Sequence, residues 1–283
     1  MVHLPPSYDA GEQAYPVVYA LHGFAADQWM MLDFVRVLDR MIRSGDAPEM
    51  IVVMPDASNA YGGSFYMRSP TIGDYETYIS QELVAWVDNS YRSIAWPESR
   101  GITGCSMGGY GALRLGLRFP QVYGAVAGVS GMYLQAYNAV LSRALQAIVA
   151  VPETPDELAY QPFEVQAVIA MAAAAAPNPD EPPFYLDMPF ATTEGGIEYV
   201  DEVLATVYAN TAVEGGSAQE ARHPHVLLYH GTHDPLALTE GARAFSALLS
   251  DQDVAHAYLE VVGGHCSLDY EPVVRFLAKH LVF

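Results

Sequence analysis

The pentapeptide Gly104-Cys105-Ser106-Met107-Gly108 constrains the fold more than any other part of this 283-residue chain. It is a GxSxG pattern, preceded by the β-branched residues Ile102 and Thr103 and followed by an apolar run with helical spacing. A serine at a sharp turn between a strand and a helix needs small neighbours, because the two backbones almost touch there. The pattern therefore predicts a nucleophile elbow that places the Ser106 hydroxyl at a helix N-terminus, where free amides favour a developing negative charge. The alternative is a glycine-rich structural turn.

Apolar strand patterns alternate with amphipathic helical patterns in both ends of the chain. Strands that are apolar on both faces are typical of a parallel sheet with helices on each side. We therefore predict an α/β fold with a mostly parallel central sheet flanked by helices, built as one domain from residues 1–130 and 223–283. Strands are expected at 15–21, 50–54, 100–105, 125–130, 225–229 and 257–262, and helices at 29–44, 74–91, 106–117, 239–250 and from 271 onwards.

The alternation of strands and helices breaks between residues 131 and 222. This stretch holds helical runs, an alanine tract at 172–176 and a proline cluster at 177–189, but no clear core strand. We predict that it is an inserted cap of helices and loops over the carboxyl edge of the sheet. Its apolar residues, such as Met188 and Phe190, argue against the alternative of a disordered linker.

An elbow serine reacts only when a base takes its proton and a third group orients that base. His265 follows a late strand and two glycines, so it is the predicted base; a surface-loop histidine is the alternative. Asp234 follows the preceding strand and is the predicted acid, although it would also suit a turn cap before Pro235. Asp269 is a weaker substitute because it is so close in sequence to His265. The order Ser106, acid, base is the one expected of an α/β-hydrolase.

A tetrahedral oxyanion needs two preorganised backbone amides. The elbow supplies the Met107 amide, and the loop His22-Gly23-Phe24 after the first long strand supplies the predicted second donor, the Phe24 amide. His22 itself is expected to be a structural histidine. Five aromatic residues are candidates for the walls of an acyl or aryl pocket, although each would also suit the core: Trp29, Phe65, Tyr66, Phe184 and Tyr185.

Four histidines between residues 223 and 233 raise the possibility of a metal site. Their spacing follows a strand and its exit, and no matching Cys or carboxylate cluster accompanies them, so we predict no metal site and no cofactor. The two cysteines are too few for a disulfide framework. Cys105 is expected to pack inside the elbow. A thiol nucleophile at Cys266 is an alternative that the elbow disfavours.

Charge and hydropathy exclude several kinds of partner. The chain has 33 acidic and 13 basic side chains, a net charge of −20, which repels nucleic acids and anionic membranes. No apolar run reaches the length of a membrane-spanning helix, so we predict no membrane insertion.

Residues 1–6 show no signal-peptide pattern, which makes the cytoplasm the default, with secretion left open if a leader is missing. Val2-His3-Leu4 looks like the end of a strand, and earlier strands are suspected to be missing. The oligomeric state is open.

Several segments resemble the esterase D group of α/β-hydrolases, which includes S-formylglutathione hydrolases, feruloyl and acetyl-xylan esterases, and mycolyltransferases. The resemblance runs from Leu4 to about Gly131 and from about Val226 to the end, and it implies a Ser-Asp-His esterase. The positions that match its triad are Ser106, Asp234 and His265, and its oxyanion amides match Phe24 and Met107. The motifs that carry it are LPPSY (4–8), YPVVY (15–19), HG (22–23), MIVVMPD (50–56), GGSFY (62–66), GDY (73–75), QEL (81–83) and SMGGYGA (106–112).

The expected function is a serine carboxylesterase that hydrolyses short acyl or aryl esters through an acyl-enzyme. The alternatives are an acyltransferase of the mycolyltransferase type, a feruloyl or acetyl-xylan esterase, and a catalytically dead hydrolase fold that serves as a binding module. Because the cap is the variable part of such enzymes, the resemblance does not give the substrate.

Overall fold

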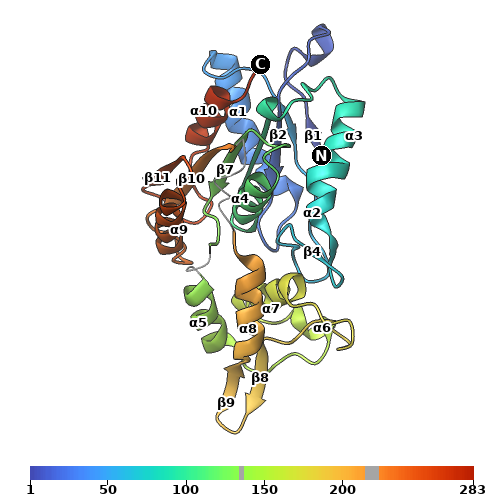
Figure 1. The fold of residues 1–283 in the computed structure, drawn as a ribbon, viewed down its shortest axis with the longest axis vertical. Helices are drawn as coiled ribbons and strands as arrows, with labels where there is room; N and C mark the ends of the chain where they lie inside the picture. The colour runs from blue at the N-terminus through green and yellow to red at the C-terminus, as the bar shows by residue number, and fades with distance from the viewer. Residues whose placement is uncertain (134–136, 214–222) are drawn as a thin grey trace.

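A seven-stranded sheet forms the centre of the computed structural model, which describes residues 1–133, 137–213 and 223–283 (Figure 1). Its strands are β1 (Val2–His3), β2 (Val17–Leu21), β3 (Ile51–Val53), β6 (Arg100–Cys105), β7 (Ala125–Val129), β10 (His225–Gly231) and β11 (His256–Val261). They lie in the order β1-β3-β2-β6-β7-β10-β11. Only the β1–β3 pair is antiparallel, so the predicted mostly parallel sheet is confirmed.

Helices cover both faces of this sheet. Successive strand residues point to opposite faces, and β2 shows this directly. Val18 and Ala20 pack in one apolar cluster with α1 (Leu32–Ser44) and α10 (Glu271–His280). Val17, Tyr19 and Leu21 pack in the other with α3 (Leu83–Ser90), α4 (Met107–Arg118) and α9 (Thr239–Asp251). The strands therefore read as continuous apolar runs because both of their faces are buried.

Local signals in the sequence explain where the helices begin and end. Gly45 closes α1 in the left-handed conformation, at φ 79°. The Asp74 side chain accepts a 2.9 Å hydrogen bond from the Thr77 amide and so caps the helix that begins with α2 (Tyr75–Thr77). A π-helical turn, Tyr78–Glu82, joins α2 to α3 within the predicted helix at 74–91. A short ladder of β4 (Arg68–Ser69) and β5 (Gly73–Asp74) precedes it.

The inserted segment, described at residues 131–133 and 137–213, adds helices and one hairpin beyond the carboxyl ends of the strands (Figure 1). The helix α7 (Phe163–Ala175) is apolar nearly all round and buried, with α5 (Tyr137–Ala147) and α8 (Asp201–Thr211) packed against it. Several hydrogen bonds tie the segment to the rest of the chain; for example, Ser69 Oγ donates to Ala173 O at 2.6 Å, and Tyr110 Oη donates to Thr211 O at 3.0 Å. The hairpin was not predicted. The elements are α5 (Tyr137–Ala147), α6 (Pro155–Leu158), α7 (Phe163–Ala175), β8 (Phe190–Thr193), β9 (Gly196–Tyr199) and α8 (Asp201–Thr211).

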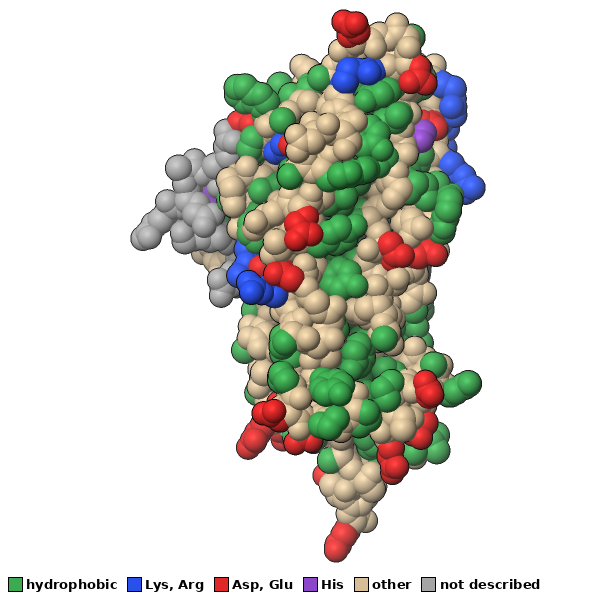
Figure 2. Space-filling view, turned by 90° about the vertical axis from the view of Figure 1, so that its right-hand side faces the viewer, with side chains coloured by type: hydrophobic (Ala, Val, Ile, Leu, Met, Phe, Trp, Pro, Cys, Tyr) green, Lys and Arg blue, Asp and Glu red, His purple; other side chains and the backbone are tan. Residues whose placement is uncertain are grey.

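The charge of the surface is uneven. Figure 2 shows both basic and acidic side chains on the upper part of one face, whereas the charged side chains of the lower part, toward the inserted segment, are Asp and Glu. Between residues 137 and 213 the chain has eleven acidic side chains and a single basic one, Arg143. Within the described residues, no helix is long and apolar enough to cross a membrane.

Candidate active site

Ser106 lies at the turn between β6 and α4, where the backbone is strained. Its φ of 58° and ψ of −119° are conformations that non-glycine residues rarely adopt, and they persist only where the surrounding structure imposes them. The Ser106 amide donates to Val129 O at 3.0 Å, and Ser106 O accepts from the Tyr110 amide at 2.9 Å. A Cβ on Gly108 would clash with Leu21 O, which is why the pattern requires glycine there. Ser106 is partly exposed among buried neighbours, so its hydroxyl can be reached.

Asp234 and His265 meet at the carboxyl edge of the sheet. Asp234 follows β10, His265 follows β11, and His265 Nδ1 lies 2.9 Å from Asp234 Oδ2. The Asp234 side chain is fully buried, and its other oxygen accepts a 2.8 Å hydrogen bond from the Leu236 amide. A proton on Nδ1 that is donated to the carboxylate leaves Nε2 as a free acceptor, which is the tautomer that a general base needs.

The alternative acid, Asp269, and the histidines considered as metal ligands make other contacts. The carboxylate of Asp269 accepts from the Glu271 amide at 3.0 Å and so caps the start of α10. His225 stacks on His280 with ring centroids 4.1 Å apart. Burial lowers the pKa of His230, which is fully buried, to about 4. His225 and His230 thus have separate surroundings, and the described residues include no group of three or more His, Cys, Asp or Glu side chains suited to a metal ion.

The two amides predicted to hold an oxyanion come from separate loops. Met107 is the first residue of α4, so its N–H has no carbonyl one turn earlier in the helix. Next to Phe24, the Ala25 amide donates to Gly62 O at 2.9 Å, which fixes the loop. The Phe24 amide itself donates to no group in the described ranges. Its role and that of Met107 stay predictions.

His22 anchors the loop that carries Phe24. Its Nδ1 contacts Gly23 O at 2.8 Å, and its Nε2 accepts from the Ala57 amide at 2.8 Å. An acceptor at Nε2 places the proton on Nδ1, and burial lowers the pKa of this histidine, so the ring is neutral. The geometry agrees with a structural histidine rather than a proton carrier.

The prediction for the two cysteines was wrong. Cys105 and Cys266 form a disulfide with their Cα atoms 5.9 Å apart, within the usual range for such bonds. Cys105 does pack inside the elbow, fully buried, but its sulfur is bonded across the site rather than only packed. Cys266 has no free thiol and cannot act as a nucleophile in this form. The prediction failed because the two residues are 161 positions apart, and only the tertiary fold brings them together.

A small cavity of about 30 Å³ opens at Ser106. Phe65 is the only one of the five predicted aromatic residues in its wall. Tyr66 is buried and donates to His22 O, and Phe184 lines a different cavity. Trp29 and Tyr185 are about half exposed. Phe24 and Met107, whose amides are the predicted oxyanion donors, also line it. Sequence patterns gave no signal for the rest of the wall: Met132, Val140, Phe163, Glu164, Ala167, Leu236 and Leu238.

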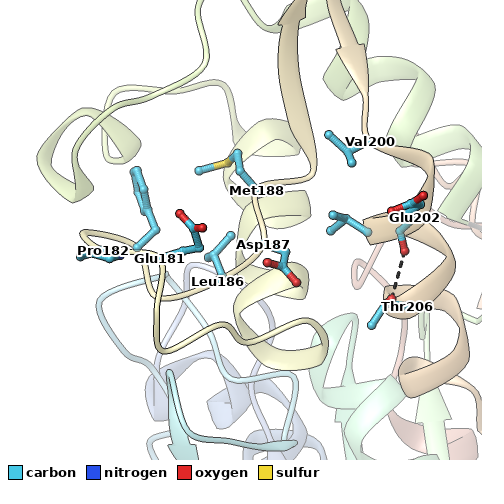
Figure 3. Close-up of a pocket in the computed structure, with 10 residues that line it drawn as sticks. Glu181, Pro182, Leu186, Asp187, Met188, Val200, Glu202 and Thr206 are labelled. Atoms are coloured by element: carbon cyan, nitrogen blue, oxygen red, sulfur yellow. Dashed lines mark hydrogen bonds between the residues drawn. The ribbon is translucent and has the colours of Figure 1, made fainter.

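A larger cavity, of about 520 Å³, lies within the inserted segment (Figure 3). Its wall mixes carboxylates with apolar side chains from the 181–188 loop and the start of α8, including Glu181, Asp187, Glu202 and Val203. No serine, cysteine or histidine lines it. Volume is therefore a poor guide to the reactive site in this chain, because the smaller cavity is the one that contains Ser106.

Comparison with known proteins gives the family. The family model named Esterase matches residues 1–272. This chain belongs to that esterase family. Its mostly parallel sheet with helices on both faces has the α/β-hydrolase fold.

Three similar proteins illustrate the match. Esterase Rv1288 of Mycobacterium tuberculosis is 33% identical over 132 residues, which is 46% of this chain and 27% of that protein, so the match spans about a quarter of the relative's length. A ferulic acid esterase structure superposes with a TM-score of 0.64 at 24% identity, covering 99% of this chain and 91% of the other. An S-formylglutathione hydrolase from Agrobacterium tumefaciens gives 0.62 at 17% identity, covering 99% and 89%. The two structural matches establish the fold.

Proposed function

We propose that this esterase is a serine carboxylesterase that works through an acyl-enzyme. Ser106 Oγ attacks the ester carbonyl carbon while His265 Nε2 takes the serine proton and Asp234 stabilises the imidazolium. The Phe24 and Met107 amides hold the oxyanion. The tetrahedral intermediate collapses as His265 protonates the departing alcohol. His265 then deprotonates a water that attacks the acyl-enzyme, and the acid is released from Ser106.

One observation carries this proposal. The 2.9 Å contact between His265 Nδ1 and the buried Asp234 carboxylate orients a base at the same sheet edge as the strained elbow serine. A hydrogen-bonded acid and base beside an accessible serine is the arrangement that activates a hydroxyl nucleophile. It argues against the catalytically dead alternative, because a binding module has no use for a strained Ser106.

The cavity at Ser106 favours a short acyl group such as acetyl. Its volume of about 30 Å³ holds on the order of two water molecules, and its wall is apolar except for Ser106 and Glu164. A feruloyl group, with an aromatic ring and a three-carbon chain, needs more room than this. We therefore favour short acyl esters over the feruloyl esters named for the structural relative.

Charge further narrows the substrate to neutral or cationic esters. Glu164 lines the cavity, and the inserted segment around it carries eleven acidic side chains and one basic side chain between residues 137 and 213. This field repels anionic esters, including glutathione thioesters. The disulfide also supports an oxidising compartment over the cytoplasm, where thiols are kept reduced.

The variant Ser106→Ala tests the proposal. We expect kcat on p-nitrophenyl acetate to fall by about 10⁴-fold or more, because the oxyanion donors alone give only a small residual rate. Labelling by a fluorophosphonate should disappear in the same variant. Ser250→Ala, on the exposed face of α9, is the matched control and should behave like the wild type.

Four results would each overturn a part of this assignment. Retention of most activity in Ser106→Ala would contradict the serine mechanism. If a fluorophosphonate does not label the wild type, the result would favour the alternative of a catalytically dead binding module. Faster product formation with an added alcohol or sugar acceptor, at the expense of free acid, would favour the acyltransferase. Higher kcat/KM for feruloyl than for acetyl esters would contradict the short-acyl specificity.

A further inference from the structure

The Cys105–Cys266 disulfide joins the two halves of the proposed reaction centre. Cys105 is the residue before Ser106, and Cys266 is the residue after His265. The bond therefore links the backbone next to the nucleophile to the backbone next to the base. Asp234 and His265 both belong to the β10–β11 side of the sheet, whereas Ser106 belongs to β6, so the acid–base contact does not itself hold the base against the nucleophile.

The loop that carries His265, residues 262–270 between β11 and α10, is called the base loop below and has to reach across the sheet. β11 is the edge strand, and β7 and β10 lie between it and β6. With neighbouring strands about 4.8 Å apart, β11 is about 14 Å from β6. The loop after β11 must therefore pass over the ends of two strands before His265 can approach Ser106.

Most attachments of this loop lead back to the β10 side. The Thr232 amide donates to Val261 O at 2.8 Å, and the His233 amide donates to Gly263 O at 2.9 Å. Toward the elbow, the Cys266 amide donates to Ser130 Oγ, just after β7, at a longer distance of 3.3 Å. Cys266 itself adopts a left-handed conformation, at φ 55°. Within the described residues, the disulfide is thus the strong link between the base loop and the elbow.

We propose that Cys105 and Cys266 are positioning residues that hold His265 at reacting distance from Ser106. This inference rests on the proposed serine mechanism. Misplacement of a catalytic group by about 1 Å can lower the rate by about 10²-fold, so a tether at this point acts on turnover. The disulfide orients the base relative to the nucleophile. It leaves the Asp234–His265 contact unchanged, because both of those residues belong to the β10–β11 side of the sheet.

The double variant Cys105→Ala/Cys266→Ala tests the tether. We expect kcat for p-nitrophenyl acetate to fall by about 10- to 100-fold, with KM changed by less than about threefold. The acid limb of the kcat/KM profile, which reports the ionisation of the base, should keep its midpoint because His265 keeps Asp234 as its partner. The rate of fluorophosphonate labelling should fall in parallel with kcat.

A disulfide that closes a loop of this length also stabilises the fold, so lower stability alone would not support the proposal. All assays are therefore made at a temperature where circular dichroism shows the variant folded. Leu249→Ala, which removes a fully buried side chain in α9 and leaves the disulfide intact, is the destabilised control and should keep the wild-type kcat.

Reduction of the wild type gives a second measurement if the double variant does not fold. Dithiothreitol supplies two electrons and two protons, so the S–S bond becomes two thiols and the reagent becomes its cyclic disulfide. We expect kcat to fall to the level expected for the double variant and to recover on reoxidation. A folded double variant, or a folded reduced wild type, with unchanged kcat would overturn the tether. Full activity in Ser106→Ala would overturn the serine mechanism instead, so the two failures are distinguishable.

Discussion

Two regions meet at Ser106, and they are held in place by different forces. On the sheet side, Ser106, Asp234 and His265 are fixed by backbone geometry, hydrogen bonds and a disulfide. On the other side, the cavity wall from the inserted segment, including Val140 and Ala167, is held by apolar packing between α5 and α7. Directional contacts specify one geometry, whereas apolar packing tolerates changes of shape as long as volume is kept. The comparison implies that substitutions on the sheet side change the rate, and those on the inserted side change the selectivity.

Asp234→Asn is the strongest test of the sheet side. The substituted amide favours the wrong tautomer of His265, so we expect kcat to fall by about 10³- to 10⁴-fold while the thermal midpoint stays close to that of the wild type. Steady-state kinetics and circular dichroism measure the two quantities. Asp269→Asn, at an exposed carboxylate that caps α10, is the matched control and should lower kcat by less than about threefold. Equal losses in both variants would show that Asp234 has no special relation to the base.

The two regions also differ in how far the sequence predicts them. Around the elbow, glycine positions, strand ends and residue order all reflect local constraints, so the positions of Ser106, Asp234 and His265 at one sheet edge could be inferred. The inserted segment offers no such signal. Its hairpin β8–β9 and the wall residues on α5 and α7 depend on contacts between segments far apart in sequence. The same limit hid the disulfide, since Cys105 and Cys266 are brought together only by the crossing of the base loop.

His230 tests how rigidly the sheet side excludes water and charge. Burial lowers its pKa from 6.5 to about 4. Between these values the unfolded chain binds a proton that the native state does not, so stability is full above pH 6.5 and is lost as the pH falls toward 4. This histidine alone accounts for a loss of about 2 kcal/mol at pH 5.

The variant His230→Phe removes this dependence. Its free energy of unfolding in urea should therefore fall less than that of the wild type between pH 7.5 and pH 5, by about 2 kcal/mol. His22, whose pKa burial also lowers, is present in both proteins and cancels in the difference. Parallel pH dependences in the two proteins would mean that His230 is protonated in the native state. The sheet side would then admit a charge or water more easily than the burial of His230 implies.

Val140→Ala probes the inserted side, where the expected effect is smallest. Val140 is buried on α5 and lines the cavity at Ser106, so its truncation enlarges the space for the acyl group by about two methyl groups. One extra methylene in an apolar pocket changes discrimination by about 10-fold or more, so the ratio of kcat/KM for butyrate over acetate esters should rise by roughly that factor. Val165→Ala is the matched control, since Val165 is equally apolar and buried on α7 but is absent from the cavity wall. A similar change of the ratio in both variants would mean that the inserted helices select the substrate through their overall packing rather than through the cavity wall at Ser106. The two regions would then differ in how they are stabilised and not in what their substitutions change.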